Sequence, residues 1–348
     1  MVEWKKLGDI CNILDSLRKP VSKGDRKKGE YPYYGANGIQ DYVDSYIFDG
    51  TYLLLGEDGS VINTDKSPVI HWAIGKIWVN NHAHVLEENE AAYLRYVYYS
   101  LQCTDVSDLV QGVPPKINQA NMRGILIPVP SKTEQTRIVG ILDTFTSAID
   151  NLKEQIAQRR KQYEYYRDQL LDLEGKEGVE MKTLGEVCKL ERGVRVVKKD
   201  LQEQGVIPVF QNSLTPLGFY EKSNYPEHTT FVICAGAAGE VGYSEIAFWA
   251  ADDCTCIICP SSICSKYVYN YLMVKQHLLK AQVRKASVPR LSKDVIGKLQ
   301  LPIPSLREQQ HIVSILDTFE ASIQNLEAQL KQREKQYEYY RNKLLSFE

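Results

Sequence analysis

Apolar residues recur about every 3.5 positions along two stretches of the chain, residues 131–175 and 305–348. In both stretches the steps between apolar positions alternate between four and three, once one arginine is counted among them. This spacing is typical of helices that pack against each other as a coiled coil. The predicted seam positions are Ile138, Leu142, Phe145, Ile149, Leu152, Ile156, Arg159, Tyr163, Tyr166, Leu170, Ile312, Leu316, Phe319, Ile323, Leu326, Leu330, Arg333, Tyr337, Tyr340 and Leu344.

The two helical stretches belong to a longer internal repeat. Residues 128–174 and 302–348 are identical at 28 of 47 aligned positions, so the repeat is an architectural unit. A serine followed three residues later by a glutamate predicts a capped helix start in each copy. About 40 helical residues reach roughly 60 Å. We expect the two helices to pack antiparallel within one chain, with a globular domain at either end.

An arginine occupies the same seam position in both copies, Arg159 in the first and Arg333 in the second. One interpretation is that each aliphatic stem packs in the seam while the guanidinium reaches water. The alternative is that each arginine fixes the helix register by pairing with an acidic residue of the opposite helix. The sequence leaves both interpretations open.

The segments before the helices, residues 1–130 and 176–304, have the pattern of compact β-rich domains. Both open with the order Leu-Gly-acid-aliphatic-Cys. Short β-branched and aromatic runs, bounded by Gly, Asp and Asn, predict strands, and each segment has one late helical pattern. The expected strands are 46–55, 70–79, 229–234 and 254–259, and the expected helices are 91–101 and 265–279.

The predicted fold class is therefore α+β. Two β-rich domains are joined by two long helices that form an antiparallel intramolecular coiled coil, with a pseudo-two-fold internal repeat. Because the two domains share their edges but differ in their interiors, they suggest one scaffold that carries two different binding surfaces.

The composition is that of a globular protein, with 43% hydrophobic and 25% charged residues. No apolar run of 18 residues predicts a membrane span, and the first residues lack the features of a signal peptide. The eight cysteines do not follow the spacing of a small secreted domain. We therefore expect reduced thiols and a cytoplasmic protein.

The net charge of −2 does not by itself indicate a nucleic-acid-binding protein. Residues 1–127 hold 13 basic and 16 acidic side chains, and residues 176–304 hold 16 basic and 13 acidic ones. Any affinity for DNA must then come from local patches rather than from the overall field.

Several ordered motifs resemble those of the specificity (S) subunits of type I restriction-modification systems, and the resemblance covers the whole chain. The motifs are YYGANGIQDYV at 33–43, YIFDG at 46–50, LGEDG at 55–59, PKIN at 115–118, IPVP at 127–130 before Glu134 and Gln135, GAAGEVG at 236–242, FW at 248–249, and LPIP at 301–304 before Glu308 and Gln309.

This resemblance implies two target-recognition domains, 1–130 and 176–304, each followed by a coiled-coil region, 131–175 and 305–348. It implies a non-catalytic subunit that recognises an asymmetric, bipartite double-stranded DNA target with a fixed spacer. The implied partners are methyltransferase (M) subunits, two in number, and restriction (R) subunits. The chain itself would need no cofactor. The helix length would set the spacer, since groove positions recur every ~34 Å.

Candidate DNA contacts fall in loops of both domains. Basic patches that could contact phosphates, unless they are simply solvated loops, are Arg18, Lys19, Lys23, Arg26, Lys27 and Lys28 in the first domain, and Arg192, Arg195, Lys198 and Lys199 in the second. A second pair of loops holds Lys116 and Asn118, and Arg284, Lys285 and Arg290. Candidates for reading base edges are Asn37, Gln40, Gln211 and Asn212.

Other chemistry is disfavoured by the sequence. Cys254, Cys256, Cys259 and Cys264 have irregular spacing for a zinc site, and the alternation of the first two fits a strand better. We expect no carboxylate or cysteine frame around the histidines at 71, 82 and 84, which favours core or surface histidines over metal ligands. The glycine-rich 236–242 lacks the Lys-Ser/Thr of a phosphate-binding loop. The alternatives to a DNA reader are a stand-alone nuclease or methylase, and a coiled-coil adaptor that binds no DNA.

Overall fold

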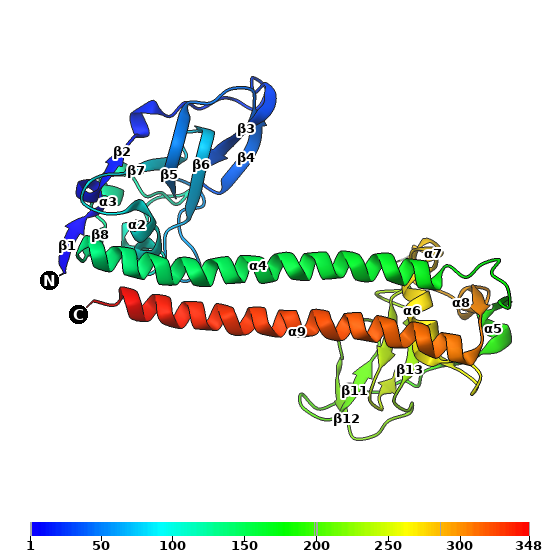
Figure 1. The fold of residues 1–348 in the computed structure, drawn as a ribbon. Helices are drawn as coiled ribbons and strands as arrows, with labels where there is room; N and C mark the ends of the chain where they lie inside the picture. The colour runs from blue at the N-terminus through cyan, green and yellow to red at the C-terminus, as the bar shows by residue number, and fades with distance from the viewer. Residues whose placement is uncertain (1, 198, 200, 286, 348) are drawn as a thin grey trace. The chain divides into compact units, whose positions relative to one another are not determined.

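The computed structural model describes residues 2–197, 199, 201–285 and 287–347. The chain forms two compact units. The first comprises Met1–Lys153 together with Ala328–Glu348, and the second comprises Glu154–Glu327. Each unit therefore holds one β-rich globule and a portion of both long helices (Figure 1).

A six-stranded sheet dominates the first unit (Figure 1). Its strands are antiparallel neighbours except for one parallel pair, β3 with β6. A separate two-stranded ribbon joins the start of the unit to the strand that leads into the first long helix. The sheet order is β2 (Cys11–Ile13), β7 (Ala83–Glu88), β5 (Phe48–Gly56), β6 (Ile70–Val79), β3 (Lys28–Gly35) and β4 (Gly38–Val43), and the ribbon is β1 (Glu3–Lys6) with β8 (Leu126–Val129).

Short helices cover the core of the first unit. The helix predicted at 91–101 is present but begins later, at Leu94, because Tyr93 before it has an extended backbone. The predicted strand 70–79 is found with the same bounds, whereas strand 46–55 lies at 48–56. The helices are α1 (Leu7–Ile10), α2 (Leu94–Leu101) and α3 (Gln119–Arg123), with short 3-10 turns at Asp15–Leu17 and Ser107–Leu109.

The second unit repeats this plan with smaller sheets. The helix predicted at 265–279 is broken into two, because Lys275 leaves the helical conformation. The elements are a four-stranded sheet of β10 (Lys189–Arg192), β16 (Cys254–Ile258), β13 (Thr229–Ile233) and β14 (Val241–Ser244); a three-stranded sheet of β12 (Gly218–Tyr220), β11 (Ile207–Phe210) and β15 (Trp249–Ala250); a ribbon of β9 (Glu180–Thr183) and β17 (Gln300–Ile303); and helices α5 (Leu184–Val187), α6 (Ser265–Val274), α7 (Gln276–Ala281) and α8 (Lys293–Gly297).

The same tertiary hydrogen bonds recur in both units. The buried hydroxyl of Tyr96 donates to the carbonyl of Pro128 at 2.6 Å, and that of Tyr267 donates to the carbonyl of Pro302 at 2.9 Å. Because these bonds join equivalent elements of unlike sequence, the internal repeat is structural as well as sequential. The predicted α+β class with an internal repeat is confirmed.

The long helices are α4 (Lys132–Leu171) and α9 (Leu306–Leu345), each of 40 residues. The backbone N–H of Glu134 donates to the hydroxyl of Ser131, and that of Glu308 donates to Ser305. The predicted serine caps are therefore present. In a full capping box the Glu134 carboxylate would also accept from the backbone N–H of Ser131. Here this carboxylate pairs with Arg137 at 2.6 Å.

The helices run antiparallel within each unit. In the first unit Phe145 stacks on Tyr340, with ring centroids 5.3 Å apart. In the second unit Tyr166 stacks on Phe319 at 5.4 Å, and further along the pair Arg160 bridges to Glu327 at 2.6 Å. Residue numbers that rise along α4 thus face numbers that fall along α9, and the predicted coiled coil is confirmed.

The seam arginines do not pair with acids in the described part of the chain. The guanidinium of Arg159 lies over the ring of Phe319, 5.9 Å from its centroid, and that of Arg333 lies over Phe145 at 5.8 Å. The register-fixing ion pairs come instead from neighbouring positions, including Arg160 with Glu327. Each seam arginine therefore places its guanidinium over an aromatic ring of the opposite helix instead of on an acid, which favours the first of the two interpretations.

A buried glutamine fastens each long helix to its globule. Gln135 and Gln309 are both fully buried. The side-chain amide of Gln309 accepts from the backbone of Cys264 at 2.8 Å and donates to the carbonyls of Ser262 and Pro304. Gln135 makes the equivalent bonds to Tyr93 and Pro130. These glutamines satisfy backbone groups that water cannot reach.

We expect Gln309→Ala to lower the free energy of unfolding of the second unit by about 2–3 kcal/mol, since a buried group that loses its partner costs about 1–3 kcal/mol. The matched control is Gln310→Ala, at the exposed neighbouring position, which should stay within about 0.5 kcal/mol. Hydrogen-exchange mass spectrometry on peptides from α6 and α9 measures the difference. Equal protection in the two variants would contradict the role of the buried amide.

Candidate nucleic-acid interface

Three loops meet at one end of the first sheet. They are the turn 36–37, the loop 57–60 and the hairpin 111–116, and together we call them the first loop edge. The backbone N–H of Gly59 donates to the carbonyl of Pro115 at 2.9 Å, which ties the hairpin to the loop. Asn37 is exposed in the turn, and Val113 at the hairpin tip is 100% exposed.

The second globule has the same arrangement. Its loop edge comprises the loop 211–217, the loop 235–240 and the hairpin formed by residues 284–285 and 287–290. The backbone N–H of Gly236 donates to the carbonyl of Pro289 at 3.2 Å, as Gly59 does in the first globule. Gly236 has a φ of +81°, and a Cβ there would lie 2.7 Å from the carbonyl oxygen of Asn212, so only glycine allows these loops to approach.

Backbone hydrogen bonds identify equivalent positions beneath the two hairpins. Ile117 donates its N–H to the carbonyl of Glu57 at 2.8 Å, and Leu291 donates to the carbonyl of Cys234 at 2.9 Å. Glu57 and Cys234 are therefore equivalent, and so are the residues before the two donors, Lys116 and Arg290.

One further equivalence follows from the strand pairing. Ile13 faces Leu86 in the first globule, as Leu190 faces Ile257 in the second. The residues that follow two positions later, Asp15 and Arg192, thus occupy the same place at the end of the sheet.

In the first globule this place is filled by an ion-pair network. The guanidinium of Arg18 contacts the carboxylate of Glu57 at 2.6 Å and that of Asp15 at 3.4 Å. Lys116 reaches the other oxygen of Glu57 at 3.0 Å. The buried ring of His84 contacts Asp15 at 2.6 Å through Nδ1 and the carbonyl of Ile117 at 2.9 Å through Nε2.

The network keeps both of its carboxylates charged. Burial by itself would raise the pKa of Asp15, but the hydrogen bond and charge of His84 outweigh it and hold the pKa below its ordinary value. Burial likewise opposes ionisation of Glu57, yet the hydrogen bonds from Arg18 and Lys116 hold its pKa below the ordinary value. Oxygen and nitrogen atoms of Asp15, Glu57 and His84 lie close enough to hold a metal ion, but Arg18 and Lys116 already neutralise them.

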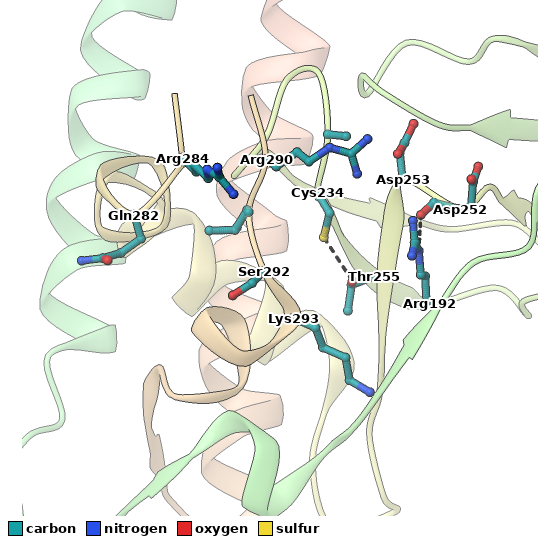
Figure 2. A pocket seen from close by; sticks show the side chains of 12 residues that line it. Arg192, Cys234, Asp252, Asp253, Thr255, Gln282, Arg284, Arg290, Ser292 and Lys293 are labelled. Atoms are coloured by element: carbon teal, nitrogen blue, oxygen red, sulfur yellow. Dashed lines mark hydrogen bonds between the residues drawn. The ribbon is translucent and has the colours of Figure 1, made fainter. Parts of the chain in front are cut away.

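The equivalent place in the second globule is an open cavity of about 510 Å³. Figure 2 shows basic side chains of the hairpin on one side of it and the carboxylates of Asp252 and Asp253 on another. Within it, the Nε of Arg192 donates to the carbonyl of Asp252 at 2.6 Å. The labelled side chains of its lining are Arg192, Cys234, Asp252, Asp253, Thr255, Gln282, Arg284, Arg290, Ser292 and Lys293.

The structure brings some predicted DNA contacts together at the loop edges. In the second globule Arg192, Arg284 and Arg290 line one cavity, and the exposed Asn212 lies beside the loop that closes it. Gln211 is also at this edge, where its amide donates to Asp253 at 3.4 Å. Lys285 is exposed in the hairpin of this edge, and the predicted contacts that are exposed elsewhere are Lys23, Lys27, Lys28, Arg195 and Lys199.

The basic patch of the first globule is divided. Lys28 begins β3 and Gly35 ends it, a separation of roughly 23 Å at about 3.3 Å per residue, so Lys23, Lys27 and Lys28 lie away from the first loop edge. Lys19 is exposed and lies closer to that edge, since its carbonyl accepts from the indole N–H of Trp78 at 2.7 Å.

Three predicted contacts are engaged within the fold. Arg18 belongs to the ion-pair network, and Arg26 lies over the ring of Tyr33 at 4.2 Å. Asn118 caps α3, where its side chain accepts from the backbone of Asn121. We leave these three out of the proposed interface because their polar groups already have partners. Lys198 lies outside the described residues.

Gln40 and Lys116 are intermediate cases. The Gln40 side chain accepts from the amide of Asn80 at 3.4 Å, while its exposed position leaves its remaining groups accessible. Lys116 is exposed although it pairs with Glu57.

The histidine and cysteine interpretations have different outcomes. The expectation that no carboxylate lies near the histidines was wrong: His84 contacts Asp15, and His82 contacts Asp58. These acids lie 69 and 24 residues away in the chain, so local spacing could not reveal them. Cys254 and Cys256 are buried on β16, as the strand alternation predicted.

The fold and the loop edges define a class of protein: a scaffold with two related β-rich globules that present different polar surfaces. Across the described residues, no helix is both long and apolar enough to cross a membrane. The sequence matches the type I restriction modification DNA specificity domain twice, over residues 1–159 and 176–334. The chain belongs to this family of specificity subunits.

Individual relatives match along nearly their whole length. A putative type I restriction enzyme specificity subunit of Haemophilus influenzae is 33% identical over 99% of this chain and 96% of its own. The EcoR124I/EcoR124II specificity subunit of Escherichia coli is 29% identical over 99% and 94%. The crystal structure of an S subunit from M. genitalium shares the fold, with a TM-score of 0.75 at 18% identity over 100% of this chain and 97% of that one.

We expect Arg18→Met to lower the free energy of unfolding of the first unit by about 3–5 kcal/mol at pH 7, because it leaves buried carboxylates without their cation. Since the folded-state pKa values of Asp15 and Glu57 lie below their ordinary values, their stabilisation is present above those ordinary values and is lost as the pH falls through the lowered ones. The penalty should therefore shrink as the pH falls through the lowered pKa values of these two carboxyls.

Urea unfolding followed by tryptophan fluorescence measures this penalty, because Trp4, Trp72 and Trp78 lie in the first unit and only Trp249 lies in the second. The control is Lys19→Met, at the exposed adjacent position, which should change stability by less than about 0.5 kcal/mol. A penalty for Arg18→Met that matches the control, or that grows as the pH falls, would contradict the network.

Proposed function

We propose that the chain recognises an asymmetric, bipartite sequence of double-stranded DNA through its two loop edges. The observation that carries this proposal is that equivalent positions beneath the two hairpins hold different chemistry, Glu57 in one globule and Cys234 in the other. Two readers that share a backbone frame but differ in side chains would select different half-sites. The exposed polar residues of the loop edges supply the groups that read base edges and contact phosphates.

The long helices set the spacing between the half-sites. Each helix runs without a break for 40 residues, beginning directly after its serine cap. A rigid helix pair would hold two readers at a fixed distance, and DNA grooves recur every ~34 Å along the duplex. The target would therefore contain a spacer of constant length whose sequence does not matter.

The chain would act as the non-catalytic recognition subunit of a larger complex. Its matched relatives are specificity subunits of type I restriction enzymes. One structurally similar chain, with a TM-score of 0.57, comes from a structure described as bearing on complex assembly and conformational transition of the type I R-M system. We propose that two methyltransferase subunits, and in the full complex restriction subunits, dock on this chain and carry the chemistry and its cofactors. A cytoplasmic location follows from that role.

Co-expression of the full chain with its methyltransferase partner should produce methylated adenines within one bipartite, asymmetric motif across the host genome. Sequencing that detects modified bases maps them, and cells that express the methyltransferase alone are the control. If a competent methyltransferase binds the chain and the genome remains unmethylated, the recognition role is wrong.

Removal of one facing heptad from each long helix should change the spacer length and leave both half-sites unaltered, because the loop edges are untouched while the seam stays in register. The same genome-wide mapping reads out the change. A control variant keeps the helix length and replaces only solvent-facing residues of the same heptads, and it should retain the original spacer. Altered half-sites with an unchanged spacer would refute the idea that the helices set the distance.

A further inference from the structure

The cavity beneath the second hairpin has an unusual balance of charge. Four cationic side chains line it, Arg192, Arg284, Arg290 and Lys293, against the two carboxylates of Asp252 and Asp253. Among the residues that the structure describes, none of the four cations forms an ion pair. The two carboxylates offset at most two of the four positive charges, so the lining keeps a net positive charge.

The first globule shows what neutralisation at this place looks like. There, carboxylates stand where the second globule has Arg192 and Cys234, and they hold the side chains of Arg18 and Lys116. An acid has thus been replaced by a base at one position and by a neutral thiol at the other. The same backbone frame gives a closed ion-pair network in one globule and an open cationic cavity in the other.

The chemistry of the walls selects the ligand. Guanidinium groups present planar forks of N–H donors that match the oxygens of a phosphate. The hydroxyls of Ser292 and Thr255 add further donors. A volume of about 510 Å³ lies within the range of roughly 300–1,000 Å³ for small-ligand sites, which admits a phosphate together with part of the group that it esterifies.

We infer that this cavity is a phosphate-binding pocket, which takes a backbone phosphate of the DNA that the second globule reads. The inference rests on the proposed function for the source of the phosphate. A free inorganic phosphate would satisfy the same groups, so the two sources are separated by experiment. In either case the second globule holds a phosphate at a place that the first globule closes with its own Arg18.

Cys234 provides a local reporter of occupancy. Its thiol lines the cavity, and burial raises its pKa, so alkylation of the full chain by iodoacetamide is measured at alkaline pH. The exposed Cys103 in the first unit is the internal reference. One arm adds a random-sequence DNA duplex and the other adds inorganic pyrophosphate. Peptide mass spectrometry gives the alkylation rate of each cysteine.

A duplex at roughly ten times its Kd should slow alkylation of Cys234 about tenfold while leaving Cys103 unaffected. Arg290→Gln should abolish this protection and reduce the salt dependence of duplex binding by about 0.9 in the log–log slope, as expected for one lost phosphate contact. The control is Lys222→Gln, an exposed lysine outside the cavity lining, which should retain both the protection and the slope.

A second pair of variants tests the charge directly. Cys234→Glu places a carboxylate where the first globule has Glu57, and it should weaken duplex binding more than Cys234→Gln, which adds similar bulk without charge. Equal weakening by the two would mean that bulk rather than charge matters and would overturn the inference.

The outcomes separate the pocket from the proposed function. Protection of Cys234 by the duplex supports a DNA phosphate, whether or not pyrophosphate also protects. Protection by pyrophosphate alone, with the duplex bound, supports a phosphate site but overturns DNA as its source. A duplex that binds without protecting Cys234, with pyrophosphate also inactive, overturns the pocket and leaves the proposed function standing. A chain that binds no duplex refutes the proposed function, and the pyrophosphate arm then decides the pocket alone.

Discussion

Each hydrophobic core is closed by the ends of both long helices, and the rest of the structure depends on this constraint. In the first unit Leu345 of α9 packs in the same core as Ile138 and Leu142 of α4. In the second unit Leu171 of α4 packs with Ile312 and Leu316 of α9. Neither globule is therefore complete without a segment that lies far from it in the sequence. Antiparallel pairing of the helices satisfies both cores at once, because it brings the end of each helix to the start of the other.

Much of this architecture follows from local sequence patterns. The 3.5-residue period and the serine caps are local signals, and they predicted the starts of α4 and α9 to within one residue, whereas the helices end four and three residues before the predicted limits. The strand 70–79 was also predicted with its observed bounds because its aromatic and branched residues are continuous. In contrast, the period alone could not show that Ile138 and Leu142 face a globular core as well as the partner helix. That role depends on how the helix start is fastened by Gln135.

The candidate site was less predictable because its partners are distant in sequence. Asp15, Glu57 and His84 meet only after three strands pair, and each looks like an ordinary polar residue at its own position. Arg18 was assigned to phosphate contact because basic residues follow it closely, yet its guanidinium turns inward to Glu57. Composition can locate a basic segment, but only the fold decides which of its side chains remain free.

At the loop edges the two globules share backbone hydrogen bonds and differ in the charges that these bonds position. The bonds from Ile117 to Glu57 and from Leu291 to Cys234 have nearly the same length, 2.8 and 2.9 Å, so this backbone bond is kept with an acid at the position in one globule and a thiol in the other. A carboxylate at this place attracts the protein's own cations and closes the space. The neutral thiol of Cys234 does not attract cations in this way. Under our inference, the cationic side chains of this cavity bind an external anion instead. The shared frame thus carries a closed ion-pair network in one globule and an open cationic cavity in the other.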